Sequence, residues 1–105
     1  GRTILSISAL SGQASIVRFA LTELNPDINA IDNDGRSPLH AAAMAPFPDA
    51  LEVLLEDDRL DINLQDNKGN TPLHLAVFKK RVETVQLLLG RRDLDITIKN
   101  RRNLT

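Results

Sequence analysis

The fold is decided by the stretch RSPLHAA at residues 36–42, which recurs 34 residues later as NTPLHLA at residues 70–76. The same offset towards the N-terminus reaches RTILSIS at residues 2–8, a degenerate copy with Ile4 in place of proline and Ser6 in place of histidine. No insertion or deletion is needed to keep this register. A fixed period of this length is typical of repeat proteins, in which each unit buries its apolar face only against its neighbours.

Other parts of the chain keep the same period. The apolar segments VRFAL, LEVLL and VQLLL begin at residues 17, 51 and 85, and DIN, DIN and DIT begin at residues 27, 61 and 95. The first of these sets has apolar residues at helical spacing. Each unit of 34 residues therefore contains the same succession of local signals.

The residue types within a unit predict a pair of helices. Ser37 and Thr71 are typical N-cap residues, and Pro38 and Pro72 follow at the first helical position, where the missing N–H would have no partner in any case. A short helix is then expected, which carries Leu39 in one unit and Leu73 in the next. After a brief turn, the apolar segment described above predicts a second helix.

Tight turns are predicted between the units. The sequence DNDG ends at Gly35 and DNKG ends at Gly69. Glycine suits positive φ, and the Asp and Asn side chains bond to local backbone groups, so these stretches favour turns over helices. Ile28 and Ile62 flank the turns and are expected to anchor extended hairpin arms.

The pattern D-x-x-G-x-[ST]-P-L-H-x-A, followed by a helix of the V-x-x-L-L type, resembles the ankyrin repeat. The resemblance covers the whole chain as repeat 1 (1–31), repeat 2 (32–65), repeat 3 (66–99) and the start of a further repeat (100–105). It implies an all-α solenoid of stacked helix-turn-helix units joined by β-hairpin loops. Each unit is one residue longer than the family's usual length of about 33. We expect a fragment of a longer array, with neither end clearly capped.

Several kinds of chemistry are disfavoured by the composition. There is no cysteine, and no motif of a nucleophile elbow, P-loop or zinc protease is present. The only histidines, His40 and His74, occupy equivalent positions in adjacent units, so about 8–10 Å is expected between them, too far for one zinc ion. The resemblance implies that each bonds to neighbouring backbone and to the hydroxyl of its helix cap. Asp32 and Asp66 are explained by turn bonding. We therefore predict no catalytic residue, no metal and no cofactor.

The structural motif residues that the resemblance implies belong to the turns and to the starts of the inner helices. They are Gly35, Ser37, Pro38, Leu39, His40, Gly69, Thr71, Pro72, Leu73 and His74.

Charge is distributed unevenly along the chain. Residues 1–68 carry five basic and eleven acidic side chains, a balance of −6, whereas residues 69–105 carry eight basic and three acidic side chains, a balance of +5. The basic end either attracts an acidic segment of another protein or is a solvated outer face that complements neighbouring units. Nucleic acid is disfavoured, because only 3% of residues are aromatic and the net charge is −1. No spanning apolar run and no secretory signal are present, which favours an intracellular protein, cytoplasmic or nuclear.

Partner contacts in ankyrin-like stacks usually come from the hairpin tips and from the inner face of the first helices. Carried onto this sequence, the resemblance implies contact residues at the tips and at the ends of the first helices. They are Asn33, Asp34, Arg36, Asn67, Lys68, Asn70, Arg101 and Arg102 at the tips, with Met44, Phe78 and Lys79 at the helix ends. Met44 and Phe78 are either contact anchors or partly buried against a neighbouring unit. In the turn around Phe47, the phenylalanine either contacts a partner or, more commonly, folds back over the stack.

The function that this resemblance implies is a non-catalytic protein–protein interaction module within a larger protein. The alternatives are a structural spacer of a longer solenoid and a regulatory docking domain of an enzyme or channel. The expected partner is another protein, with an acidic segment at the basic end, and self-association through uncapped ends is a further expectation.

Overall fold

The computed structural model describes residues 3–103, so Gly1, Arg2, Leu104 and Thr105, at the two ends of the predicted repeats, lie outside the described residues. It contains six α-helices and one π-helical turn. These are α1 (Ile4–Leu10), α2 (Ala14–Phe19), η1 (Ala20–Leu24), α3 (Pro38–Met44), α4 (Asp49–Leu55), α5 (Pro72–Phe78) and α6 (Val82–Leu89). No β-strand occurs within residues 3–103. The prediction of an all-α stack of helix-turn-helix units is confirmed.

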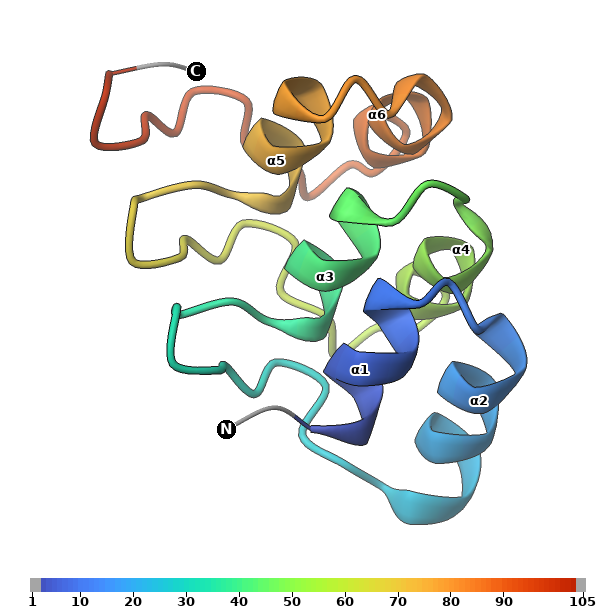
Figure 1. The fold of residues 1–105 in the computed structure, drawn as a ribbon. Coiled ribbons are helices and arrows are strands. Elements are labelled where there is room, and N and C mark those ends of the chain that lie inside the picture. The colour runs from blue at the N-terminus through green and yellow to red at the C-terminus, as the bar shows by residue number, and fades with distance from the viewer. Residues whose placement is uncertain (1–2, 104–105) are drawn as a thin grey trace.

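The helices are arranged in two rows, with the loops between units on one side (Figure 1). The first helices of the units, α1, α3 and α5, lie in one row, and α1 contacts α3 as α3 contacts α5. The second helices, α2, α4 and α6, form the other row, in which α2 contacts α4. The molecule is elongated, with extents of 39 × 27 × 23 Å. We call the α1, α3 and α5 row the inner helices and the other row the outer helices.

The inner helices begin where the sequence predicts. The Ser37 Oγ accepts a hydrogen bond from the His40 N–H at 3.4 Å, and Pro38 occupies the first helical position. In the next unit the Thr71 Oγ1 accepts from the His74 N–H at 3.3 Å. These caps satisfy N–H groups that the first helical turn leaves without an intrahelical partner. The N-cap predictions are therefore confirmed.

The core is built from leucine and alanine side chains. In the middle unit Leu39, Leu51 and Leu54 are fully buried, and so are Ala42 and Ala43 on α3. One apolar cluster includes buried residues from all three units. Short alanine side chains allow neighbouring helices to approach closely, so a chain with very few aromatic residues still fills its interior.

The loops between units are hairpin-shaped turns. The Asp32 N–H donates to the Arg36 carbonyl at 2.9 Å, and the Asp32 Oδ1 accepts from the Arg36 N–H at 3.0 Å. Asp66 makes the same two bonds with Asn70 one unit later. Gly35 has φ +75°, as its turn requires. The turn roles predicted for the two aspartates are confirmed, but the loops form no strand within residues 3–103.

No helix within residues 3–103 has the length and apolar character needed to cross a membrane.

Candidate functional site

The tips of the hairpin loops form a continuous row. The Asn67 N–H donates to the Asp34 carbonyl at 2.9 Å, and the Arg101 N–H donates to the Lys68 carbonyl at 3.1 Å. These bonds join each tip to the next, so equivalent positions follow one another along the stack. Asp34, Lys68 and Arg102 are equivalent and all exposed. The charge at this position therefore changes from negative to positive towards the C-terminal end.

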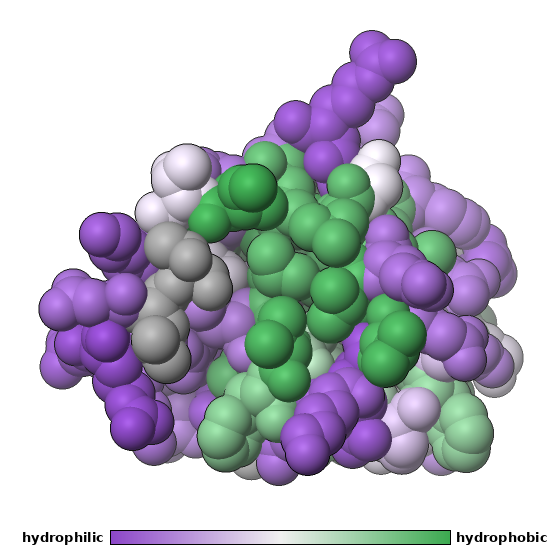
Figure 2. All heavy atoms as spheres, turned by 90° about the horizontal axis from the view of Figure 1, so that it is seen from above, coloured by the Kyte–Doolittle hydropathy of each residue, from purple (hydrophilic) through white to green (hydrophobic). Residues whose placement is uncertain are grey.

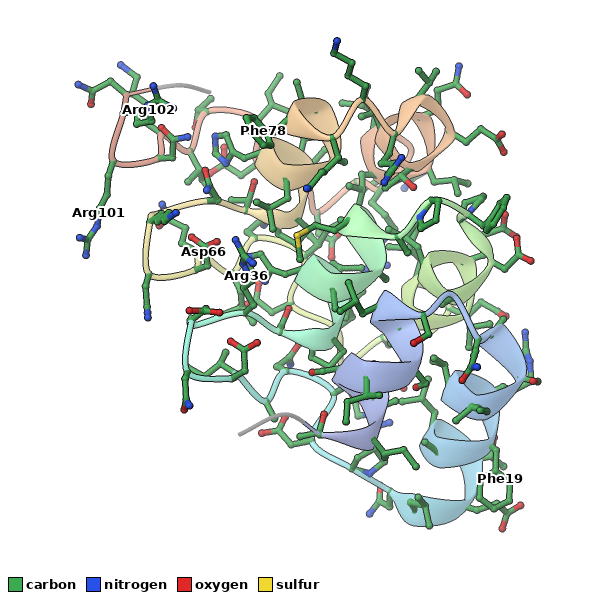
Figure 3. The ribbon with its side chains drawn as sticks, in the orientation of Figure 1. Phe19, Arg36, Asp66, Phe78, Arg101 and Arg102 are labelled. Atoms are coloured by element: carbon green, nitrogen blue, oxygen red, sulfur yellow. The ribbon has the colours of Figure 1, made fainter. Side chains whose placement is uncertain are left out.

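The C-terminal ends of the inner helices present a second row of equivalent residues. Leu10 is 37% exposed, Met44 is partly buried, and Phe78 is 75% exposed. The Lys79 ammonium lies 6.0 Å from the centre of the Phe78 ring, a cation–π distance. Figure 3 shows Phe78 at the α5 end of the molecule. Of the two proposed anchors, Phe78 is therefore the exposed one, and Met44 is partly covered, as the alternative interpretation expected.

Three of the predicted tip residues bond within the molecule. The Arg36 Nε lies 3.3 Å from the Asp66 Oδ2, whose side chain is only 2% exposed (Figure 3). The Asn67 side-chain amide donates to the Asn33 carbonyl at 3.0 Å. Asn70 accepts through its side-chain oxygen from the Asn100 amide at 2.8 Å.

The remaining tip residues have a different environment. Asn33, Asp34, Lys68, Arg101 and Arg102 are exposed, and Figure 3 shows Arg101 and Arg102 extending from the last tip. The predicted tip set therefore divides into side chains that brace the loops and side chains that face solvent.

His40 links two units in the interior. Its Nδ1 accepts a hydrogen bond from the Ser37 N–H at 3.1 Å, so its Nε2 carries the proton and donates to the Asn70 carbonyl at 2.8 Å. The side chain is fully buried. His74 repeats the first contact, accepting from the Thr71 N–H at 2.9 Å. The predicted structural role of these histidines is confirmed for the cap contact in both units. Across residues 3–103, no three His, Asp or Glu side chains lie close enough together to hold a metal ion.

A family model described as "Ankyrin repeats (3 copies)" matches residues 5–100. The chain belongs to the ankyrin repeat family. Ankyrin repeats are generally protein–protein interaction modules and are typically non-catalytic. A search of curated proteins found no significant match.

Two asparagines, Asn29 and Asn63, join neighbouring ankyrin units, and the sequence analysis did not single them out. The Asn29 amide donates to the Arg59 carbonyl at 2.9 Å, and its oxygen accepts from the Asp61 N–H at 2.8 Å. Asn63 makes the equivalent pair of bonds to the third unit. Their recurrence at the unit period was visible in the sequence, but only the stacked structure shows that each reaches the following unit.

Two carboxylates, the partly buried Asp57 and the exposed Asp95, have a lowered pKa. Hydrogen bonds from the Arg59 side chain and N–H lower the pKa of Asp57, and the same contact raises the pKa of Arg59. Hydrogen bonds from Thr97 lower the pKa of Asp95. Asp95 and Arg59 are exposed, so water screens their interactions and these contribute little to stability.

Phe47 in the turn between α3 and α4 points outward. Its side chain is 67% exposed, so it does not fold back over the ankyrin stack, which was the commoner of the two expected arrangements. Pro46 before it is also exposed, and Pro48 after it is only partly buried. The turn belongs to the middle unit. It lies on the side of the inner helices opposite to the hairpin tips (Figure 1).

A shallow groove runs along the outer helices, lined by residues of α2, α4 and α6. Its polar side chains include Asp49, Glu52 and Glu56, and the Arg18 Nη2 lies 3.4 Å from the Glu56 Oε2 across it. The groove is therefore largely acidic, in contrast to the basic tips at the C-terminal end.

The burial of His40 predicts a pH-dependent stability. Burial lowers the pKa of His40 below its usual 6.5, so the folded state binds a proton less readily than the unfolded state. The free energy of unfolding should therefore be fully retained above pH 6.5 and fall as the pH drops from 6.5 towards the lowered pKa, with a slope of at most about 1.4 kcal/mol per pH unit. Urea unfolding followed by circular dichroism at a series of pH values measures this.

The matched variant for this measurement is His40→Gln, which removes the titrating ring and keeps a polar side chain. We expect it to be less stable than the native chain above pH 6.5 and to lose less stability on acidification. Equal pH dependence in both proteins would show that His40 does not cause the effect.

Proposed function

We propose that this chain binds another protein through the tip–helix surface, formed by the exposed tip residues Asp34, Lys68, Arg101 and Arg102 and by Met44, Phe78 and Lys79 at the inner helix ends. The observation that supports this most is the exposure of Phe78, at 75%, beside Lys79. A large exposed aromatic next to charged groups is the type of residue that anchors protein interfaces. We also propose that the chain is part of a larger protein.

The rigidity of the loops favours binding. Backbone bonds tie each tip to the next, and the Arg36–Asp66 ion pair and the Asn67 amide hold the loop side chains in place. A surface that is ordered before a partner arrives loses little conformational entropy on association. The internal bonds of the bracing tip residues therefore contribute to binding indirectly, by holding Lys68 and its neighbours.

The chemistry of the surface favours an acidic partner segment. Lys68, Arg101 and Arg102 are exposed at the last two tips, and Lys79 lies beside the aromatic ring. Positive side chains arranged in this way attract carboxylates and raise the rate of association. The proposed ligand is a peptide segment with Asp or Glu residues on either side of one apolar residue, which would contact Phe78.

A peptide-display selection on the folded chain tests this proposal. We expect enrichment of peptides that combine acidic residues with an apolar anchor, and weaker binding at high salt. The affinity of a selected, fluorescently labelled peptide is measured by fluorescence anisotropy. Phe78→Ala should lower this affinity about 10- to 30-fold. The double variant Lys68→Ala, Arg101→Ala should lower it about tenfold. Changes at Asn67 and Asn70 are avoided, because they would disturb the loops.

The matched control is Phe47→Ala, which removes another exposed phenylalanine, 67% against 75% for Phe78, outside the tip–helix surface. It should leave peptide affinity unchanged. Circular dichroism checks that each variant is folded. If no peptide is enriched, the alternative role of a structural spacer is favoured, and if Phe78→Ala binds as well as the native chain, this surface is not the binding site.

A further inference from the structure

The row of outer helices opens at an internal boundary of the stack. Helix α2 contacts α4 closely, but within residues 3–103 α4 and α6 make no comparable contact. The difference is visible at equivalent positions, because Val53 on α4 is 6% exposed, whereas Leu87 on α6 is only partly buried. The second and third units therefore meet through their inner helices, and the outer side of their boundary is open.

An arginine holds this boundary at the C-terminal end of α4. The Arg91 Nη1 donates to the Leu55 carbonyl at 2.8 Å, and the Arg91 Nη2 pairs with Asp93 at 2.9 Å. The equivalent position in the middle unit is Asp57, which accepts from Arg59 instead. The third unit is thus tied to α4 by a long side chain, and the charge of that side chain is already paired.

The groove along the outer helices has an apolar part as well as a charged one. Its apolar lining residues are Ala14, Val53, Leu55 and Leu87, and its volume is about 650 Å³. A small molecule usually loses most of its surface to the pocket that binds it, which a shallow groove does not allow. A segment of polypeptide chain, in contrast, can lie along such a groove and leave one side in solvent.

The charged part of the groove lies on one face of α4. Asp49, Glu52 and Glu56 are all exposed, and their spacing of three and four residues places them on the same side of the helix. Arg18 is the basic residue of the lining, and it pairs with Glu56. Asp49 and Glu52 have no ion-pair partner within residues 3–103. The groove therefore has carboxylates that are free to pair with a ligand.

We propose that a basic amphipathic helix of a partner protein docks in this groove along α4. Lysine or arginine side chains of the partner face Asp49, Glu52 and Glu56, and its apolar side chains contact Leu55 and Leu87. Charge complementarity selects this occupant over an acidic or a wholly apolar segment. The three carboxylates span about 10 Å of the α4 axis at 1.5 Å per residue, so a partner helix of about three turns is long enough to reach them all.

This groove is separate from the tip–helix surface. Figure 2 views the stack from the end of the last unit and shows hydrophilic residues on the side of the tips and on the side of the outer helices, with a hydrophobic area between them. The tip–helix surface is basic at its C-terminal end, whereas the groove is acidic. The inference therefore goes beyond the proposed function, because it assigns a second site for a ligand of opposite charge.

A peptide-display selection on a chain with a disabled tip–helix surface tests the proposal. The chain carries Phe78→Ala, Lys68→Ala and Arg101→Ala, so its result does not depend on whether the tip–helix surface binds. We expect enrichment of peptides that combine lysine or arginine with apolar residues at helical spacing. If no basic amphipathic peptide is enriched, the proposal is wrong.

The location of binding is tested with one enriched peptide that carries a fluorescent label. Its affinity for the otherwise native chain is measured by fluorescence anisotropy and should fall at high salt. The double variant Glu52→Gln, Glu56→Gln should lower the affinity about tenfold, because it removes two facing charges and keeps the side-chain shape. Leu87→Ala, which trims the apolar part of the groove, should lower it about fivefold.

The matched control is the double variant Glu23→Gln, Asp58→Asn. It changes the net charge by the same amount at two exposed residues that do not line the groove, so the affinity should stay unchanged. Equal losses in the two double variants would show that only net charge attracts the peptide, and no loss for Glu52→Gln, Glu56→Gln would show that the groove is not the site. Either result overturns the proposal. Circular dichroism checks that each variant is folded.

A second copy of the chain is the rival occupant of the groove, because Arg101 and Arg102 are exposed and basic. Sedimentation equilibrium distinguishes the two. We expect the native chain and the double variant Glu52→Gln, Glu56→Gln to have the same average mass at every concentration. Association of the native chain that this variant abolishes would show that a second copy fills the groove, and the proposal of a partner helix would be wrong.

Discussion

Replacing Leu39 by alanine should lower the free energy of unfolding by about 3–5 kcal/mol. Leu39 is fully buried on α3, which contacts an inner helix on each side. Truncation removes apolar contacts and leaves a cavity that the flanking units can fill only by moving together. A domain of this size is stabilised by only about 5–15 kcal/mol, so the loss is a large share of the total. Urea unfolding measures the loss.

Leu73→Ala is the matched control, because it removes the same atoms from the equivalent position of the last unit. Leu73 is only partly buried, since within residues 3–103 no helix follows α6 to cover its far side. We expect it to cost about 1–2 kcal/mol. Equal losses for the two variants would mean that contacts across unit boundaries do not set the stability of the stack.

The second large effect is expected for Gly35→Ala, with a loss of about 2–4 kcal/mol. Gly35 has φ +75°, which costs any residue with a side chain about 1–2 kcal/mol. The added Cβ would also lie 2.5 Å from the Asn67 Oδ1 and 2.9 Å from the Asn67 backbone nitrogen. Relieving this clash must separate two hairpin tips and strain the bond from the Asn67 N–H to the Asp34 carbonyl.

Gly12→Ala separates the two causes. Gly12 also has positive φ, +69°, but no atom lies within 4 Å of the position its Cβ would take. The control should therefore lose only about 1–2 kcal/mol, and the excess for Gly35→Ala measures the close approach of neighbouring tips. Thermal unfolding of both variants provides the comparison, and equal losses would show that the approach of the tips is not limiting.

Much of the fold could be predicted from local chemistry repeated at a fixed interval. The caps at Ser37 and Thr71 and the prolines after them act within one helical turn, so they can be recognised without knowing the rest of the structure. The turns at Gly35 and Gly69 depend on one residue's tolerance of positive φ. Because the units are alike, assigning the helices and turns of one unit correctly also gave the helices and turns of the others.

The candidate site could be predicted only in part. The sequence indicated the tips and Phe78, but it could not separate Lys68, which is exposed, from Arg36, which pairs with Asp66 of the next unit. Phe47 shows the same limit, because its outward position depends on packing around the turn. Side-chain partners across unit boundaries lie about thirty residues apart. Hydrogen bonds over that range do not change which residue types are favoured locally, so local sequence patterns do not predict them.

The sequence by itself determined the repeat unit, its helices and its turns, because these follow from interactions within a few residues of the chain. The cap contact of the histidines was implied by the family resemblance, and the bond from His40 to the Asn70 carbonyl is seen only in the tertiary structure. Only the tertiary structure decided which equivalent side chains are covered and which are exposed. Burial at a given position depends on whether a neighbouring unit lies against it, so Ile62 is buried while Ile96, with the same residue type at the same place in its unit, is 60% exposed.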